Sequence, residues 1–186
     1  LLAEAGSIRP TDWAVLELSS FQLMTMTRSP HIAVLTNLAK HHPGVQILAK
    51  QGIANANDGE VVASALITQH PDIQAIYAPW DSIAEGVVAA TRAAGRSDIK
   101  VITMDLGAAN ALDMAKGRNV AGIVTDLPYD LGQTLATMGA LAKLGEQTPP
   151  FVTVSADAVT RDNLADAWQQ ALRRDPPAAV TKALSQ

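Results

Sequence analysis

VQILAKQ at residues 45–51, IQAIYAPW at 73–80, IKVITMD at 99–105 and VAGIVTD at 120–126 are four short runs of mostly apolar residues. Polar turns and amphipathic helical patterns separate them, as in DSIAEGVVAATRAAG at 81–95. Short apolar runs that alternate with helical patterns of this length are typical of βαβ units. We therefore predict an α/β fold, a three-layer αβα sandwich of the flavodoxin-like type, with a mainly parallel sheet of about five to seven strands.

The composition narrows the possible classes of protein. The 186 residues suit one domain, so we predict a single α/β domain over residues 1–186. A hydrophobic content of 48% with 17% charged residues excludes a disordered chain or a coiled coil. The net charge of −4 argues against nucleic acid or an anionic membrane as a partner. The absence of cysteine excludes disulfides, thiolate metal sites and cysteine nucleophiles.

Neither a membrane span nor a leader is predicted. No apolar run approaches the roughly 20 residues that a membrane-spanning helix needs. The first ten residues, LLAEAGSIRP, lack a basic segment followed by a long apolar core, so we expect no signal peptide there.

Two further strands are predicted before the repeated stretch, DWAVLELSS at 12–20 and HIAVLTN at 31–37. DWAVLELSSFQL followed by SPHIAVLTNLA resembles the central domain of Mur ligases, in particular the D-glutamate-adding ligases, over residues 1–39. The resemblance implies that Glu17 helps to position a catalytic magnesium ion and that Ser19 lies near a uridine nucleotide.

The chain departs from the Mur pattern at two places. It contains no glycine-rich phosphate loop ending in Gly-Lys-Ser/Thr, the segment that cradles ATP with backbone N–H groups. His42 falls at the family's metal-associated histidine by count, but in the different context KHHPG. We therefore expect no catalytic activity, and a metal site at Glu17 remains only a weak alternative.

From His41 onward the sequence has a second resemblance. HHPGVQILAKQ, HPDIQAIYAPWD, GIVTDLPYDLGQTLATM and PPFVTVSADAVTRDNLADAWQQAL occur in this order. Over residues 40–172 they resemble the second lobe of periplasmic sugar-binding proteins of the ribose-binding type, and we assign residues 40–175 to such a lobe. The resemblance implies half of a two-lobed sugar-binding site. We expect residues 176–186 to be a frayed tail, because prolines interrupt the segment that contains them.

Two resemblances that meet at Leu38–Lys40 suggest a chimera, and we favour engineered recombination over a natural gene. Seven residues, Leu38–Gly44, separate the predicted strands at 31–37 and 45–51. A parallel crossover needs about a dozen residues, so the strand order near residues 37–45 stays open. The sugar-binding parents are periplasmic and the Mur parents cytoplasmic, so no compartment is predicted.

Candidate ligand-binding residues follow from the fold, because ligands of open α/β sheets bind outside the carboxyl ends of the strands. The residues selected in this way are Gln51, Asn55, Trp80, Asp81, Asp105 and Asp126. The resemblance implies that Asp105 accepts a sugar hydroxyl, that Asp126 stands where glutamine is common, and that Trp80 replaces an asparagine. Asp81 and Asp126 could instead cap helices, and Trp80 could be a core aromatic.

A helix is predicted from Pro128 to Gly145, with Leu131, Leu135 and Met138 in an apolar stripe. The resemblance implies that this helix packs on a first lobe that the chain lacks. We expect residues 1–39 to cover the stripe, or a homodimer to form through it.

The leading hypothesis is a chimeric, non-enzymatic scaffold that binds a small sugar or polyol weakly at the strand ends, without a cofactor or metal. The alternatives are a Mur-type ligase fragment with residual magnesium or nucleotide binding, and a truncated natural solute-binding protein.

Overall fold

The computed structural model describes residue 42, residues 44–53 and residues 55–186. The chain divides into two units, Leu1–Ile47 (unit 1) and Leu48–Gln186 (unit 2). In unit 1, the carbonyl of the exposed His42 accepts the N–H of Val45 at 2.9 Å, so this histidine lies in a solvated turn. The strands predicted at 12–20 and 31–37, with Glu17 and Ser19, lie outside the described residues.

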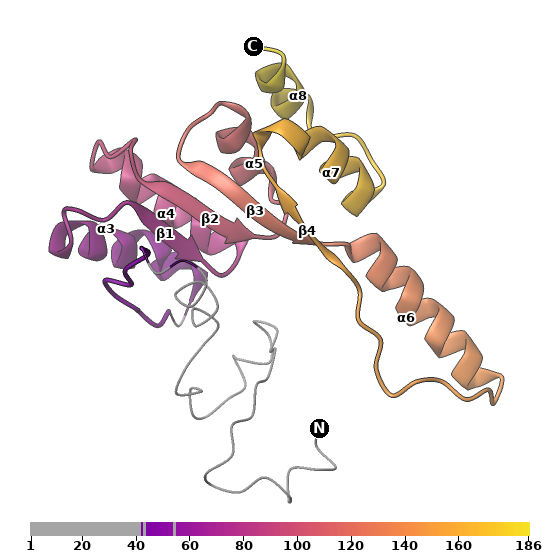
Figure 1. Cartoon of the computed structure of the whole chain (residues 1–186). Helices are drawn as coiled ribbons and strands as arrows, with labels where there is room; N and C mark the ends of the chain where they lie inside the picture. The colour runs from indigo at the N-terminus through magenta and orange to yellow at the C-terminus, as the bar shows by residue number, and fades with distance from the viewer. Residues whose placement is uncertain (1–41, 43, 54) are drawn as a thin grey trace, which may run out of the picture. The chain divides into compact units, whose positions relative to one another are not determined.

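Unit 2 is built around one sheet with the strand order β1-β2-β3-β4 (Figure 1). Its strands are β1 (Ala75–Ala78), β2 (Lys100–Met104), β3 (Val120–Asp126) and β4 (Ala156–Val159). The pairs β1–β2 and β2–β3 are parallel, whereas β4 runs antiparallel to β3. The predicted α/β class with a mainly parallel sheet is therefore confirmed, with four strands among the described residues.

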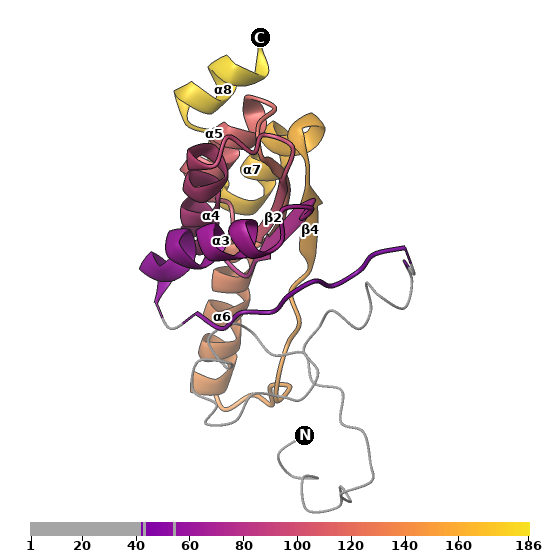
Figure 2. The ribbon, with the colours of Figure 1, turned by 90° about the vertical axis from the view of Figure 1, so that its left-hand side faces the viewer.

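Helices follow the first two strands as the sequence pattern predicts. They are α4 (Asp81–Ala93) after β1 and α5 (Ala108–Ala115) after β2. Crossovers between parallel strands are right-handed, and both step in the same direction, so α4 and α5 cover the same face of the sheet (Figure 2). The short turn η2 (Ala56–Asp58) leads into α3 (Gly59–Gln69), which packs beside α4.

The core lies between the sheet and these helices. Ile99, Val101 and Ile123 from the strand segments are at most 1% exposed. Met114 of α5 and Leu164 are equally inaccessible to solvent. Burial of such aliphatic side chains stabilises the fold by roughly 1.5–3 kcal/mol for each one.

The C-terminal helices are η3 (Arg161–Asn163), α7 (Leu164–Leu172) and α8 (Ala178–Leu184). Helix α7 buries an apolar face that contains Leu164, Trp168 and Ala171. The expectation of a frayed tail is wrong, because α8 buries Val180 and Ala183 and packs against α5. Prolines are well tolerated where a helix begins, so the prolines before Ala178 precede this helix rather than break it.

The strand predicted for VQILAKQ at residues 45–51 is also a wrong prediction. These residues form no strand, and Val45 and Ile47 are exposed. Apolar and β-branched residues favour a strand only where a neighbouring strand supplies hydrogen bonds, and this run pairs with none of β1 to β4. Leu48 packs against the core instead, as does Ile53.

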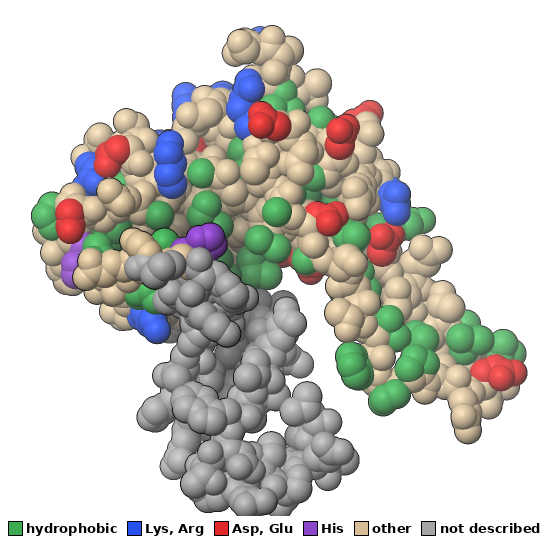
Figure 3. Space-filling model, in the orientation of Figure 1, with side chains coloured by type: hydrophobic (Ala, Val, Ile, Leu, Met, Phe, Trp, Pro, Cys, Tyr) green, Lys and Arg blue, Asp and Glu red, His purple; other side chains and the backbone are tan. Residues whose placement is uncertain are grey.

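Helix α6 (Pro128–Lys143) begins at a proline in its first turn, as predicted. It projects away from the sheet in Figure 1, and none of its 16 residues is buried. Leu135 is 64% exposed, and apolar side chains line the helix in Figure 3. Within unit 2 the predicted apolar stripe is therefore uncovered.

The crossing of α3 and α4 depends on two small residues. A Cβ atom added at Gly86 would lie 2.7 Å from the backbone nitrogen of Glu60, and one at Gly59 would lie 2.8 Å from the carbonyl oxygen of Ile83. Real Cβ contacts are longer than this, so the backbones can approach closely only because neither glycine carries a side chain.

The first prediction concerns this crossing. Gly86→Ala should lower the free energy of unfolding by about 1–3 kcal/mol, because the two helices must move apart. Gly132→Ala in α6 is the matched control, since nothing lies within 4 Å of its Cβ position. The control should leave stability unchanged or raise it by up to about 1 kcal/mol. Urea unfolding of both variants checks this, and equal effects would contradict the close crossing.

Candidate ligand site at the carboxyl edge of the sheet

The carboxyl ends of β1, β2 and β3 meet at one edge of the sheet because the three strands run in the same direction. The chain leaves β2 at Asp105 and ends β3 at Asp126, so these two residues lie on neighbouring strands. Asp81 begins α4, three residues after Ala78, the last residue of β1. We call Asp81, Asp105 and Asp126 the aspartate cluster.

Asp105 has an unusual backbone conformation. Its φ angle is 68°, in the left-handed region that aspartate and asparagine adopt more readily than most residues. Its N–H donates to the carbonyl of Val124 at 2.9 Å, and its carbonyl accepts the N–H of Gly107 at 3.0 Å. A tight turn held to β3 therefore fixes the position of Asp105 at the edge.

The carboxyl group of Asp105 titrates far from its ordinary range. Partial burial, a hydrogen bond with Asp126, and the nearby charges of Asp126 and Asp81 raise its pKa to about 6. When Asp105 is protonated, its hydroxyl can donate to the carboxylate of Asp126. Burial, and secondarily the charge of Asp105, also raises the pKa of the half-exposed Tyr77 on β1.

Asp81 approaches the same edge from α4. Its Oδ1 accepts the N–H of Ser82 at 2.7 Å, and its carbonyl accepts Nδ2 of the buried Asn110 at 2.9 Å. Gly107 leaves room for the carboxylate, since a Cβ there would lie 2.7 Å from Oδ2 of Asp81. The N-cap position belongs to Trp80, and Asp81 is the first helical residue, where its carboxylate still accepts one exposed N–H of the first turn.

The other candidates lie apart from the cluster or have structural roles. Trp80 is partly buried and packs against the core, which favours the core-aromatic alternative. Asn55 precedes η2, where its backbone N–H donates to Oδ2 of Asp58 at 3.1 Å. Gln51 is exposed, and among the described residues no hydrogen bond links it or Asn55 to the aspartate cluster. The N-cap position of α6 belongs to Leu127, so Asp126 does not occupy it.

Three residues near the cluster were not selected from the sequence. Tyr77 lies within a strand rather than after it. Gly107 leaves space for the Asp81 carboxylate, and Asn110 donates a hydrogen bond to the Asp81 carbonyl. Only Asn110 carried a usable signal, because a polar residue on the buried face of an amphipathic helix needs a hydrogen-bond partner.

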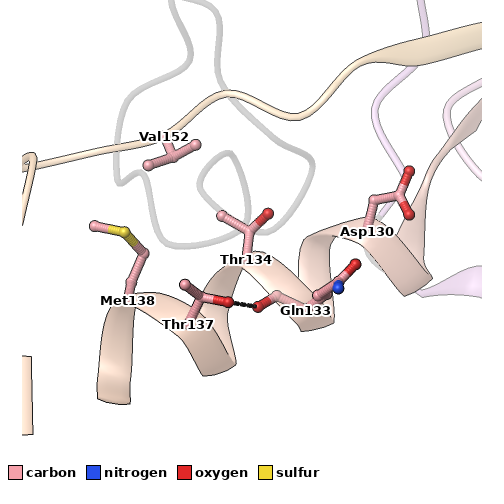
Figure 4. A pocket seen from close by; sticks show the side chains of 6 residues that line it. All are labelled: Asp130, Gln133, Thr134, Thr137, Met138 and Val152. Carbon is pink, nitrogen blue, oxygen red and sulfur yellow. Dashed lines mark hydrogen bonds between the residues drawn. The ribbon is translucent and has the colours of Figure 1, made fainter. Parts of the chain in front are cut away.

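Two hollows of unit 2 lie away from the aspartate cluster. A groove of about 300 Å³ runs between α6 and the connection that returns to β4 (Figure 4). Its walls are formed by Asp130, Gln133, Thr134, Thr137, Met138 and Val152. A second hollow, of about 550 Å³, lies near the start of β3 and is lined by Lys116, Arg118 and Arg161 among others.

The described residues contain neither a metal-binding cluster nor a helix that could span a membrane. No group of three or more histidine, cysteine, aspartate or glutamate side chains there is placed to hold a metal ion. The helices of the described part are too short or too polar to cross a membrane.

Comparison with protein families and curated proteins gives matches of two kinds. A family model described as a periplasmic binding protein domain matches residues 31–147. The D-ribose/D-allose-binding protein of Pseudomonas aeruginosa is 44% identical over 64 residues, which cover 33% of this chain and 20% of that protein. The UDP-N-acetylmuramoylalanine–D-glutamate ligase of Acetivibrio thermocellus is 57% identical over 42 residues, 23% of this chain and 9% of the ligase.

Solved structures share the fold. A 5-methylthioribose transporter solute-binding protein from Thermotoga lettingae has a TM-score of 0.63 and 25% identity, over 81% of this chain and 48% of that one. A carbohydrate transporter solute-binding protein from Agrobacterium radiobacter, in complex with D-arabinose, has a TM-score of 0.65 and 28% identity, over 74% and 48%. The predicted three-layer, flavodoxin-like class is therefore confirmed. The chain spans about half the length of these neighbours.

The second prediction concerns the pH dependence of stability. The pKa of Asp105 is higher in the native state, about 6, than its ordinary value of 3.8, so ionising it disfavours folding as the pH rises through 6. The full shift corresponds to roughly 3 kcal/mol, which solvent exposure reduces to about 1 kcal/mol. Asp105→Asn keeps a residue suited to positive φ and removes the charge. Relative to the wild type, this variant should therefore gain about 1 kcal/mol between pH 4 and pH 8.

Urea unfolding at both pH values measures this gain. Asp98→Asn is the control of opposite sign, because a hydrogen bond from Arg96 lowers the pKa of the Asp98 carboxyl. That variant should lose stability relative to the wild type as the pH rises from 3 to 7. An Asp105→Asn difference that stays constant between pH 4 and pH 8 would contradict the electrostatics of the cluster.

Proposed function

Because the chain belongs to the periplasmic binding protein domain family, we propose that it is a non-catalytic module that binds a small sugar or polyol at the carboxyl edge of its sheet. The observation that carries this proposal is the position of Asp105 and Asp126 at the ends of the neighbouring strands β2 and β3, with Asp81 at the start of α4. Carboxylates accept strong hydrogen bonds from hydroxyl groups, which is the chemistry that a polyol ligand requires.

The ligands of the solved neighbours support this class of ligand. The neighbours contain 5-methylthioribose, D-arabinose and, in a protein from Agrobacterium vitis with 25% identity and a TM-score of 0.61, allitol. Asp105 is the residue that we place at the centre of the site, with Asp126 and Asp81 beside it. Gln51, Asn55 and Trp80 belong to its periphery.

We expect the affinity of this chain to be low. Tight sugar sites bury most of the ligand surface, and closure of two lobes around the ligand supplies that burial. A chain that spans about half the length of its neighbours encloses a ligand from one side. A dissociation constant in the millimolar range corresponds to about −4 kcal/mol of binding free energy.

The third prediction is that D-ribose, D-arabinose and allitol bind with dissociation constants of about 1 mM or weaker, as measured by ligand-detected NMR. Asp105→Asn should weaken this binding several-fold, whereas Asp98→Asn, at the opposite edge, should not. Micromolar affinity would contradict a one-sided site. Complete absence of binding, with the fold intact, would contradict the proposed function.

A ligase fragment with residual magnesium or nucleotide binding at Glu17 and Ser19 is the second candidate function. The 57% identity to the D-glutamate ligase over 42 residues favours it, and the missing phosphate loop counts against it. A thermal-shift assay with Mg-ATP and a uridine nucleotide distinguishes the two candidates, because a ligand that binds only the native state must raise its stability.

We also infer that the chain is a chimera, engineered by recombination of fragments. Similarity to two unrelated classes, a ligase over 42 residues and a binding protein over 64 residues, supports this origin. A truncated natural solute-binding protein is the alternative. A natural gene that encodes both segments in one reading frame would favour the alternative.

A homodimer through the helix from Pro128 to Gly145 is our proposal for the uncovered side of α6. Leu131, Leu135 and Leu141 of this helix are exposed, as are Phe151 and Val152 on the returning connection. Asp130 lies in the first turn and Lys143 in the last. An antiparallel pair of α6 helices would therefore bring opposite charges together at both ends of an apolar contact.

The fourth prediction is that sedimentation equilibrium detects a species of twice the chain mass of 19.5 kDa as the concentration rises. Leu135→Glu should abolish it by placing a charge in the contact. Val61→Glu is the matched control, since Val61 of α3 is 72% exposed and lies outside α6. A strictly monomeric wild type, or equal effects of both substitutions, would contradict the dimer.

A further inference from the structure

Helix α6 is attached to the sheet at a single place. β3 ends at Asp126, and only Leu127 separates this strand from Pro128, where α6 begins. The returning connection reaches β4 at Ala156, which is the register partner of Asp126. The chain therefore leaves the sheet and comes back to it at adjacent positions. We call residues 127–155 the arm.

Contacts at the base of the arm determine the angle at which it projects. None of the 16 residues of α6 is buried, so burial in the core does not fix this helix. Among the described residues, a single side-chain hydrogen bond joins α6 to another helix or strand segment. That bond comes from Arg173, the residue that follows α7.

Arg173 contacts two neighbouring residues in the first turn of α6. Its Nη2 donates to Oδ1 of Asp130 at 3.0 Å, and its guanidinium carbon lies 5.3 Å from the centre of the Tyr129 ring. An ion pair between partly exposed groups is weak by itself, and a cation over an aromatic ring adds a comparable contribution. Both contacts use one guanidinium group, so a single side chain joins α6 to the end of α7.

The backbone that carries this side chain is held in place. Arg173 has a φ angle of 52°, a left-handed conformation in which arginine is uncommon. Its N–H donates to the carbonyl of Gln169 at 2.9 Å, which closes the end of α7. Helix α7 buries its apolar face, and Nε2 of Gln170 donates to Oδ2 of Asp157 on β4 at 2.9 Å. Arg173 therefore links the arm to a helix that is fixed on the core.

We propose that Arg173 is a latch that holds the arm at one angle to α7, and that its release lets the arm adopt a range of angles. The inference does not depend on polyol binding, because no residue of the aspartate cluster takes part in these contacts. The latch sets the direction in which the exposed leucines of α6 point. Salt at about 1 M shortens the Debye length to roughly 3 Å and screens exposed ion pairs, so ionic strength controls the latch.

The role of Arg173 as a latch is separable from its role in ending α7. Asparagine adopts the left-handed conformation readily, so Arg173→Asn keeps the helix end and removes both contacts. Asp130→Asn and Tyr129→Leu each remove one contact from the side of α6. Arg174→Asn is the matched control, because Arg174 is exposed, carries the same charge and forms no ion pair within the described part of the chain.

The fifth prediction concerns the angle of the arm, measured by pulsed EPR on the full chain. The sequence contains no cysteine, so Ala140→Cys on α6 and Ala165→Cys on α7, both exposed, carry the only spin labels. Unlabelled chain in excess removes distances between copies. At low salt, the labelled chain with Arg173 intact should give one narrow distance distribution.

The ratio of chains at this distance to chains at all other distances should fall when the latch is weakened. We expect a fall of about two- to fivefold in Asp130→Asn and in Tyr129→Leu, and of about tenfold in Arg173→Asn, which loses both contacts. Sodium chloride at about 1 M should act like Asp130→Asn. Arg173→Lys, which keeps the charge, should lie between the wild type and Arg173→Asn, and Arg174→Asn should match the wild type.

A broad distance distribution in the wild type would overturn the latch, as would a distribution that Arg173→Asn leaves unchanged. Equal broadening in Arg173→Asn and Arg174→Asn would indicate a general effect of lost positive charge, and would also overturn it. Circular dichroism checks that Arg173→Asn keeps its helices. If this variant unfolds, Asp130→Asn and Tyr129→Leu decide the question by the same distance measurement.

Discussion

The common direction of β1, β2 and β3 is the constraint on which the rest of unit 2 depends. It brings the carboxyl ends of the three strands to one edge of the sheet. The connections that lead into β2 and β3 therefore lie at the other edge. That second edge is held by polar contacts in the interior. Asp113, which is 2% exposed, accepts a hydrogen bond from Arg92 and another from the N–H of Val120 at 2.8 Å. Nδ2 of Asn119 donates to the carbonyls of Arg96 and Ile99. These hydrogen bonds tie α4, α5 and the connections between strands together at the edge where the parallel strands begin.

The elements of the central repeat could be predicted from the sequence because their signals are local. The runs at 73–80, 99–105 and 120–126 each contain a strand, and the pattern at 81–95 contains α4. The run at 45–51 looks the same in sequence but forms no strand, since its conformation depends on a neighbour that the local pattern does not specify.

The aspartates of the site could be predicted for the same reason, since a rule about parallel sheets selects the residues that follow each strand. The interaction between these aspartates could not be predicted from the sequence. The pKa of Asp105 depends on burial and on Asp126 and Asp81, which come from different elements. The space beside Gly107 that admits the Asp81 carboxylate is likewise a property of the folded chain. The half-exposed Tyr77 was overlooked because it lies inside a strand.

Helix α6 and the carboxyl edge share one origin in the fold. Each lies where β3 ends. The helix presents exposed leucines, and the edge presents aspartates that form no ion pair among the described residues. A binding lobe that functions as half of a larger site would have both features. The location of the bound ligand is therefore the most direct evidence on what the chain does.

Amide chemical-shift mapping with a polyol ligand measures that location. A titration with D-ribose should shift the amide resonances of Tyr77, Ser82, Asp105 and Gly107, at the carboxyl edge, and leave those of Arg96, Lys116 and Gly117 unchanged. Shifts that concentrate along α6 or around Lys116, or that spread evenly over the chain, would contradict a ligand site at the aspartate cluster.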